Sequence, residues 1–275
     1  MKGVTAAAAA PVSPASSVPD EYPLAGECLP PDSAGSGAYE LRFARGREQL
    51  DQILALRFAV FNLELNEGLV ESFTTGRDED ELDRRFHHLM ICHRDSGEVV
   101  GTYRMQTPEM AGRFGGYYTA GEFDLSTVPP EILARSIEIG RACVSLEHRN
   151  GRVLYALWRG LAAYLTWNRK TALFGCCSLT SQDPALGVAT LQHLETLGCL
   201  ESRFRVEPLP ALGCEVAAGA PLPAAHIPAL FQSYLNLGAR VCGPAAIDRR
   251  FRTIDFLVLL DVLDLDPRVF QRFFG

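Results

Sequence analysis

The chain has 275 residues, of which 47% are hydrophobic, and a formal net charge of −7 at pH 7. This length and composition suffice for a sizeable hydrophobic core, and we expect a single folded domain. The negative charge, with basic residues scattered among acidic ones, argues against nucleic-acid binding. The eight cysteines, two of them adjacent at Cys176 and Cys177, lack the paired spacing of metal ligands. We therefore expect no metal site and reduced thiols, as in a cytosolic protein.

Residues 1–37 are mostly Ala, Pro, Ser and Gly, with almost no large apolar side chain. Such a segment buries too little surface to order itself, so we expect a disordered N-terminal tail followed by a folded domain over residues 38–275. No uninterrupted apolar run approaches the ~18 residues that span a bilayer. Any membrane contact is therefore expected to be peripheral.

The first part of the domain predicts a strand at Tyr39–Phe43 and an amphipathic helix at Glu48–Leu63 that carries Arg57 and Phe61. An acidic stretch follows at residues 64–83, and we expect most of it to be a solvated loop. Its last acidic residues include Asp80 and Asp83, which stand three apart just before the next apolar segment.

A hairpin is predicted next, from Phe86–His93 and Glu98–Thr107, because Asp95, Ser96 and Gly97 supply turn residues between two apolar runs. Arg104 then lies on a central strand. A guanidinium is costly to bury alone, so it needs a carboxylate partner or a carboxylate ligand. We expect Glu138 as the internal partner, or the carboxylate of a substrate as the functional one.

The region from Arg135 to Thr166 joins a strand to a helix. In the strand, Ile137–Leu146, strict alternation would place Arg141 and Cys143 among apolar side chains. One extra residue near Gly140 restores a single apolar face, which is typical of a β-bulge. The same shift brings Glu138, Arg141 and Cys143 to the opposite face together.

The helix is predicted to begin at the loop His148–Arg152, with free backbone N–H groups at its positive end. With the unpaired groups of the bulge, Gly151 and the charges of Arg149 and Arg152, this end suits an extended amide-rich chain that ends in a phosphate. A phosphopantetheine arm is such a chain. A plain strand-and-helix unit with a solvated arginine pair is equally compatible with the pattern.

The rest of the chain predicts further elements of an α/β domain. They are a buried strand at Thr171–Leu179 parallel to the central one, a helix starting at Asp183–Pro184, a loop at Glu207–Pro228, a helix at Ile227–Leu237, an extended segment at Arg240–Ile247 and an apolar strand at Ile254–Leu260. Gly115–Asp124 is expected to form a glycine-rich turn and an aromatic strand.

Strand, bulge, loop and helix together resemble the donor-binding core of the GCN5-related N-acetyltransferase (GNAT) fold. The loop signature of that fold keeps only its middle glycine here, at Gly151 in His148–Val153. The chain is more similar to the branch that takes acyl groups from acyl carrier protein. Within it, Glu138–Val144 (EIGRACV) and Leu173–Leu179 (LFGCCSL) resemble the L-ornithine N-acyltransferases, and the resemblance runs from about Tyr39 to the C-terminus.

The resemblance implies a fold and an activity. The fold is a GNAT-like α/β domain with a mixed, mostly antiparallel sheet, flanking helices and a bulged central strand. The activity is transfer of a 3-hydroxyacyl group from acyl carrier protein to the α-amine of L-ornithine, which yields lyso-ornithine lipid. The phosphopantetheine arm of the carrier protein is the donor, and no other cofactor is implied. Such an enzyme would act in the cytoplasm or peripherally on the inner membrane.

The resemblance also implies a role for particular residues. From the bulge argument, Glu138 and Arg141 are the expected catalytic residues. Glu138 is either the base that removes a proton from the ammonium or a structural partner that neutralises Arg104 or Arg141, and the oxyanion is expected on a backbone N–H near Cys143 or Val144. Asp80 and Asp83 are expected to neutralise an arginine or to hold a cationic amino acid. The full expected sets are Arg57, Phe61, Asp80, Asp83 and Arg104 for the substrate, and Cys143, Val144, Arg149, Gly151 and Arg152 for the arm.

Two other readings stay open. The chain could make other N-acyl amino acids or an acyl-homoserine lactone, although Glu67 stands where the homoserine-lactone branch has a tryptophan in the acyl site. It could also be a catalytically silent acyl-binding protein, because its loop signature is degenerate.

Overall fold

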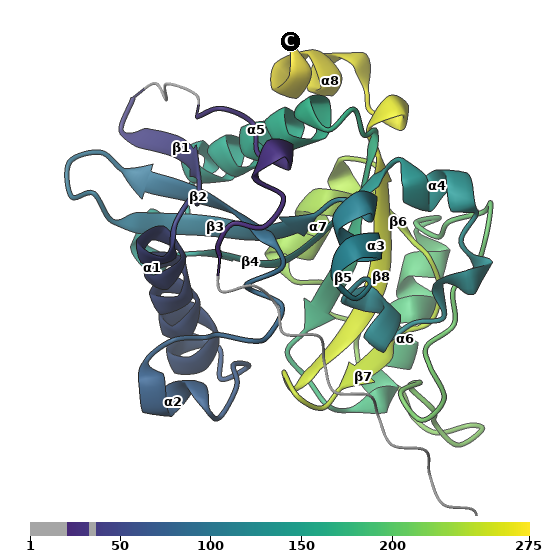
Figure 1. Cartoon of the computed structure of the whole chain (residues 1–275). Coiled ribbons are helices and arrows are strands. Elements are labelled where there is room, and N and C mark those ends of the chain that lie inside the picture. Colours follow the sequence, from purple (N-terminus) through teal and green to yellow (C-terminus); the bar gives the residue numbers. More distant parts are fainter. Residues whose placement is uncertain (1–20, 33–36) are drawn as a thin grey trace, which may run out of the picture.

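The computed structural model describes residues 21–32 and 37–275. Within them, one mixed sheet has the strand order β1-β2-β3-β4-β5-β8-β6, and β7 pairs with β8 (Figure 1). β4 runs parallel to β5, whereas the other described neighbours pair antiparallel. The strands are β1 Tyr39–Phe43, β2 His87–His93, β3 Val99–Gln106, β4 Ser136–Val144, β5 Ala172–Leu179, β6 Arg240–Val241, β7 Ala246–Asp248 and β8 Thr253–Asp261. The predicted mixed, mostly antiparallel sheet is confirmed.

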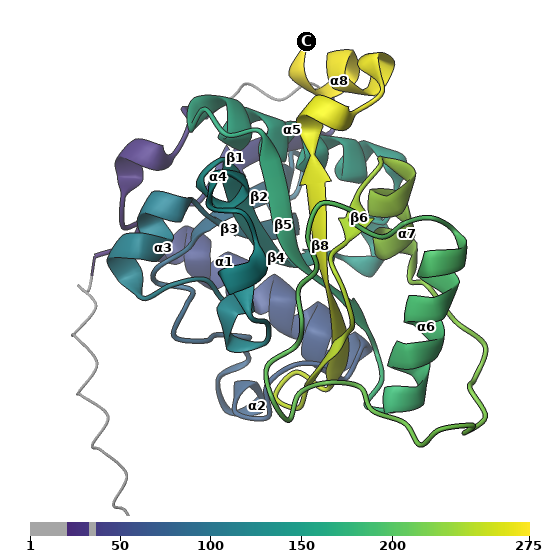
Figure 2. The same cartoon turned by 90° about the vertical axis from the view of Figure 1, so that its right-hand side faces the viewer.

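Helices cover both faces of the sheet. Figure 1 shows α5 on one face of β1 to β3 and α1 on the other, and Figure 2 shows α6 and α7 beside the half formed by β6 and β8. The helices are α1 Arg47–Arg57, continued by a π-helix at Phe58–Glu64, α2 Ser72–Thr75, α3 Pro108–Phe114, α4 Pro130–Ala134, α5 Gly151–Trp167, α6 Pro184–Thr196, α7 Ala229–Asn236 and α8 Pro267–Phe274. None of the helices in the described part of the chain is long and apolar enough to cross a membrane.

The α5 helix forms where its apolar spacing predicts it. Val153, Leu157, Leu161 and Leu165 recur every four residues and are buried against the sheet. The helix approaches β2 closely at Gly160, where an added Cβ would lie 2.5 Å from the side chain of Leu89. The main core therefore lies between α5 and the sheet.

The predicted bulge is confirmed, with one correction. Thr102 pairs with Cys143 and Arg104 with Gly140, so two residues of β4 oppose one residue of β3. The left-handed residue of the bulge is Arg141, with φ 46°, and not Gly140. A non-glycine residue with this backbone conformation is strained, so contacts with its surroundings must hold it in place. The guanidinium of Arg141 is ion-paired to Asp78, which supplies that hold.

β4 and β5 diverge beyond a short parallel pairing. Their ladder joins Ser136–Glu138 to Ala172–Phe174, and the strands separate after that. Gly175 lies at the point of separation, where an added Cβ would be 2.0 Å from the carbonyl oxygen of Ile139. Only glycine allows the two backbones to approach so closely before they part.

Residues 21–32 pack on the domain, although the sequence analysis placed them in the tail. Tyr22, Leu24 and Leu29 are buried. The Tyr22 hydroxyl lies 2.9 Å from Nδ1 of His88, and Nε2 of His87 donates to the carbonyl of Leu24 at 2.7 Å. The rest of the predicted tail, residues 1–20 and 33–36, lies outside the described residues.

Two predicted strands differ from the structure. Residues 115–124 are loop and 3₁₀ turns, with an isolated bridge between Phe123 and Pro208, so the predicted aromatic strand is wrong. Gly115 and Gly116 have φ values of 105° and 93°, which turn the chain out of an extended path. The extended segment expected at residues 240–247 is divided between β6 and β7.

Replacing Gly175 with alanine should force β4 and β5 apart, because the new methyl group would overlap the Ile139 carbonyl. We expect a loss of about 1 to 3 kcal/mol in the free energy of unfolding, the usual scale for overpacking. Gly140→Ala is the matched control, since nothing lies within 4 Å of its added Cβ. Chemical denaturation compares the two, and equal stability of Gly175→Ala and the parent would contradict the close approach.

Candidate functional site

A cavity of about 300 Å³ lies where β4 and β5 separate. Neighbouring residues on a strand point to opposite faces of a sheet. Tyr103 and Arg104 of β3 nevertheless both line this cavity, as do Cys176 and Cys177 of β5. The cavity therefore extends through the sheet and is bordered by side chains of both faces.

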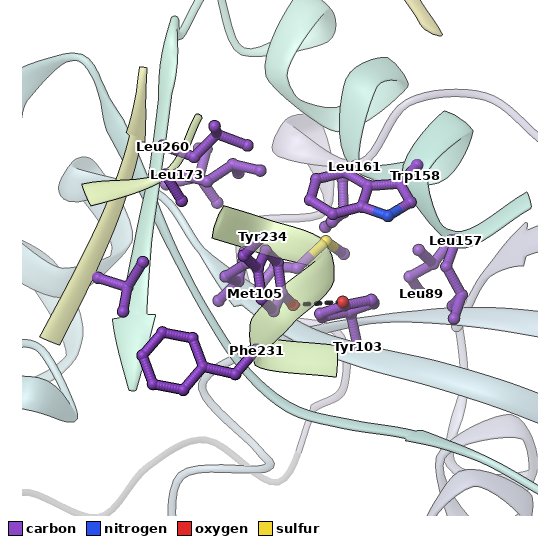
Figure 3. Close-up of a cluster of buried hydrophobic side chains, with 14 of the residues drawn as sticks. Leu89, Tyr103, Met105, Leu157, Trp158, Leu161, Leu173, Phe231, Tyr234 and Leu260 are labelled. Carbon is purple, nitrogen blue, oxygen red and sulfur yellow. Dashed lines mark hydrogen bonds between the residues drawn. The ribbon is translucent and has the colours of Figure 1, made fainter. Parts of the chain in front are cut away.

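The end on the α5 side is apolar. Its walls are aromatic and aliphatic side chains from β3, β5, α7 and β8, namely Tyr103, Leu173, Phe231, Tyr234, Val258 and Leu260. Figure 3 shows Tyr103 and Tyr234 pointing toward each other, with their hydroxyl groups hydrogen-bonded. One of the two hydroxyls donates to the other, so a hydrocarbon chain at this end would meet one unused O–H of the pair rather than two.

The opposite end is polar and charged. Its walls include Arg104, Tyr118, Arg141, Asp255 and Glu67. The Arg104 guanidinium lies over the Tyr118 ring, 5.6 Å from its centroid. Burial raises the pKa of Glu67, and its carboxylate accepts a hydrogen bond from Thr180. Two fixed positive charges and two carboxyl groups thus face one small volume.

A buried ionic network positions the two arginines. Asp83 accepts from Arg57 Nη1 at 2.5 Å and from Arg104 Nη1 at 3.1 Å, and Nε2 of His88 lies 3.2 Å away. Burial alone would raise the pKa of Asp83, but Arg57 and Arg104 hold it well below its ordinary value. Asp80 accepts from Arg104 at 2.7 Å.

Asp78 connects this network to the bulge. It accepts from Arg57 Nε at 3.1 Å and is ion-paired to Arg141. Three guanidinium groups therefore meet three carboxylates, and the network is close to neutral. Such a balance is what allows several charges to be buried together.

These contacts correct several sequence predictions. Arg104 pairs with Asp80 and Asp83, so the predicted pairing with Glu138 is wrong. Arg57, Asp80 and Asp83 were expected to bind the substrate, but they are buried in the network and do not line the cavity. The alternative expectation, that the two aspartates neutralise an arginine, is what the structure contains.

Arg141, expected as a catalytic residue, and Phe61, expected to bind the substrate, both line the cavity, and their roles stay predictions. The Arg141 guanidinium is packed between the rings of Phe61 and Phe251, 4.1 and 4.3 Å from their centroids. Its buried Nε has no hydrogen-bond partner among the described residues. A guanidinium fixed on both faces and left with an unused N–H is suited to a planar carboxylate.

Glu138 does not line the cavity, and its side chain is only 1% exposed. Its two oxygens accept hydrogen bonds from the backbone N–H groups of Tyr118 and Thr119, from the Thr119 hydroxyl and from Gln106, at 2.6 to 3.1 Å. Burial raises the pKa of Glu138, and these donors oppose the rise. The geometry favours a positioning role, in which Glu138 fixes the loop that carries Tyr118, over the predicted role as base.

The residues expected to hold a donor arm lie around the start of α5, outside the cavity lining. Arg149 forms a bidentate pair with Glu64, at 2.5 and 2.7 Å, and donates to the Val144 carbonyl. Two amide groups that were expected to be free, those of Arg152 and Val153, are capped by the Asn150 side chain. Gly151 is exposed at the first position of the helix. The role of this loop stays a prediction.

Cys143 is buried against the π-helix, beside Leu56, Val60 and Phe61. Its side chain therefore packs in the core, and burial raises the pKa of its thiol to about 12. A role in arm binding would fall to the backbone of the bulge rather than to this side chain.

A second acidic group was missed by sequence reasoning. Glu122, in the loop after Tyr118, and Asp255 of β8 bring carboxylate oxygens within 4.8 Å of each other and of the Cys176 sulfur. Burial raises the pKa of Glu122 to about 9 and that of Asp255 to about 6. The signal for Asp255 was present, since it is an acid inside an otherwise apolar strand. Nothing in the sequence connects it to Glu122, which lies on a loop 133 residues earlier.

The sequence of the chain is similar to those of known acyltransferases. Residues 56–159 match a family model described as an acetyltransferase (GNAT) domain. The chain is 32% identical over 258 residues to a protein of Agrobacterium fabrum named L-ornithine N(alpha)-acyltransferase, covering 87% of this chain and 86% of the relative. A protein of the same name from Rhizobium meliloti is 30% identical over 246 residues, covering 83% and 82%.

Solved structures were compared as well. The acyl-homoserine lactone synthase MesI has a TM-score of 0.46 and 14% identity, with 85% of this chain and 92% of that chain covered. The acyl-homoserine lactone synthase LasI has a TM-score of 0.43 and 14% identity, with 83% and 91% covered.

Replacing Asp83 with asparagine should destabilise the fold strongly, because Arg57 would lose a buried charged partner. We expect a loss of about 3 to 5 kcal/mol in the free energy of unfolding. Asp51→Asn is the matched control, since it removes an exposed partner of Arg77 and should cost less than about 1 kcal/mol.

The loss should depend on pH in a stated direction. The pKa of Asp83 is lowered by folding, so its stabilisation is present above its unfolded pKa of about 4 and disappears as the pH falls through the folded value. Denaturation at pH 7 and at pH 3 measures the difference between parent and variant. If Asp83→Asn at pH 7 loses as little free energy of unfolding as Asp51→Asn does, the network does not hold the site.

Proposed function

This chain belongs to the L-ornithine N(alpha)-acyltransferase family, and on that premise we propose that it transfers a 3-hydroxyacyl group from acyl carrier protein to the α-amine of L-ornithine, with lyso-ornithine lipid as the product. The observation that supports this proposal most strongly is the cavity that passes through the sheet. A single space with an apolar end and a charged end suits a reaction that joins a hydrocarbon chain to an amino acid.

The donor would enter where β4 and β5 separate. Beyond Glu138 and Phe174 the two strands no longer pair with each other. The inner edge of each strand can therefore offer N–H and C=O groups to the amides of a phosphopantetheine arm. The acyl chain would then extend past Tyr103 and Tyr234 into the apolar end.

The acceptor would occupy the charged end. The Arg141 side chain lines this end and is 11% exposed, and its positive charge suits the α-carboxylate of an amino acid. With the carboxylate held there, the neighbouring α-amine can face the thioester at the bulge. Proximity of this kind supplies much of the rate enhancement in an acyl transfer.

The chemical step is a direct attack. The α-ammonium first loses a proton, and the neutral amine then attacks the thioester carbonyl. A new C–N bond forms, the carbonyl oxygen becomes an oxyanion held by a backbone N–H of the bulge, and collapse breaks the C–S bond. The arm leaves as a thiolate that takes up a proton, and the nitrogen loses its second proton to give the amide. Arg149 and Arg152, near the start of α5, would contact the acidic carrier protein.

The direct test is a product assay. Purified protein is incubated with 3-hydroxyacyl carrier protein and a panel of ornithine and the twenty common amino acids, and the products are identified by mass. We expect 3-hydroxyacyl ornithine, with a fragmentation pattern that places the acyl group on the α-nitrogen. A lactone, or acylation of a different amino acid in preference to ornithine, would overturn the proposal. Binding of the carrier protein without any product would indicate a silent acyl-binding protein.

Replacing Glu138 with glutamine tests whether this residue positions the loop or acts as the base. As a positioning residue, it should lower kcat/KM by about 10²-fold through displacement of Tyr118. The pH–rate profile should keep its shape, because no titrating group of the reaction is removed.

A role of Glu138 as the base predicts a different pH dependence. If Glu138 were the base, the variant should lose roughly 10²- to 10⁴-fold and recover part of that loss at high pH, where the amine deprotonates in solution. Thr119→Val is the matched control, since it removes one side-chain donor to Glu138 and retains the carboxylate. Its pH–rate profile should keep the parent shape in both cases.

A further inference from the structure

The buried acidic pair Glu122 and Asp255 has no role in the mechanism above, yet it adjoins the reaction cavity. Asp255 lines the charged end, and its side chain is only 3% exposed. Glu122, 6% exposed, brings a carboxyl oxygen within 4.8 Å of one of Asp255 and does not line the cavity. Asp255 stands opposite Ser178 in the ladder between β5 and β8, so it faces the same side of the sheet as Cys176 and the Tyr118 loop.

The pair has more acceptors than donors. Oε1 of Glu122 and Oδ1 of Asp255 are buried and have no hydrogen-bond partner among the described residues. Among the nearby donors, the Cys176 thiol donates to Oε2 of Glu122 at 3.7 Å and the Tyr118 hydroxyl donates to Asp248 at 3.0 Å. Hydrogen bonds from Ser178 and Thr253 lower the pKa of Asp255. Glu122 is protonated near neutral pH and can share its proton with Asp255, which leaves further acceptor positions on both groups. A ligand that brings N–H donors would satisfy them.

We propose that Glu122 and Asp255 form a subsite for the side-chain ammonium of the acceptor, which selects amino acids that carry a second amine. This inference rests on the proposed function. A primary ammonium offers three N–H donors and one positive charge. The pair offers unpaired oxygens and, because Asp255 ionises far more readily than Glu122, one negative charge near neutral pH.

The subsite also completes the recognition of a dibasic amino acid. Arg141 on β4 would hold the α-carboxylate at one wall of the charged end, and Asp255 on β8 would hold the distal ammonium at the other. The α-carboxylate and the distal ammonium of the bound amino acid would then each face a protein group of opposite charge. The α-amine would be left unpaired. That amine is the one that must lose its proton and react.

The test compares ornithine with L-norvaline, which has the same carbon skeleton and no side-chain amine. The parent should prefer ornithine, and Asp255→Asn should lower kcat/KM for ornithine by roughly 10- to 100-fold, mostly through KM, while kcat/KM for norvaline changes little. Glu122→Gln is the second variant and should shift the ratio in the same direction. Removing a buried charge from a like-charged pair should not unfold the protein, and thermal melting checks this for both variants.

Asp51→Asn is the control, since it removes an exposed carboxylate that does not line the cavity. It should keep the parent ratio of ornithine to norvaline. Equal losses on both substrates in Asp255→Asn would overturn the subsite and assign Asp255 to proton transfer or to a metal ion held with Cys176. Loss of activity in the parent on treatment with a chelator would identify the metal. A parent that makes no acyl-ornithine would overturn the proposed function itself, whereas an unchanged ratio in Asp255→Asn would overturn only the subsite.

Discussion

The site depends on the burial of three guanidinium groups against three aspartates. Asp78, Asp80 and Asp83 come from one short loop, while their partners Arg57, Arg104 and Arg141 come from α1, β3 and β4. Removing so many charges from water is expensive, and a buried ion pair often adds little net stability. The network instead fixes the positions of the arginine side chains, because each guanidinium is paired with carboxylates of this loop. Two of the three arginines then present a fixed positive charge to the cavity.

Backbone geometry supplies the second constraint. The bulge at Arg141 turns the end of β4, and Gly175 lets β5 approach β4 closely just before the strands part. The outcome is a cavity through the sheet rather than a groove on one face of it. Under the proposed function, the acyl chain and the acceptor would meet at this point from opposite faces of the sheet. Glu138 contributes from outside the cavity by fixing the loop of Tyr118, whose ring stacks against Arg104.

Much of the fold could be predicted from the sequence, because the signals are local. The slip in alternation around Gly140 predicted the bulge, and the spacing of Val153, Leu157 and Leu161 predicted α5. The partners of the charged residues could not be predicted in this way. Arg104 meets aspartates that precede it by more than 20 residues, and Glu122 meets Asp255 across more than 130. The loop at 115–124 was predicted as a strand because its aromatic residues favour strands. In the structure, two of its backbone N–H groups instead donate hydrogen bonds to the Glu138 carboxylate.

The central claim is that acyl chain and amino acid meet inside one cavity from opposite faces of the sheet. A crystal structure with the product N-(3-hydroxyacyl)-ornithine tests it most directly. The account predicts the acyl chain beside Tyr103 and Tyr234, the amide at the bulge of β4 and the amino-acid carboxylate on Arg141. A product with both parts on one face of the sheet, or with its carboxylate far from Arg141, would contradict the account.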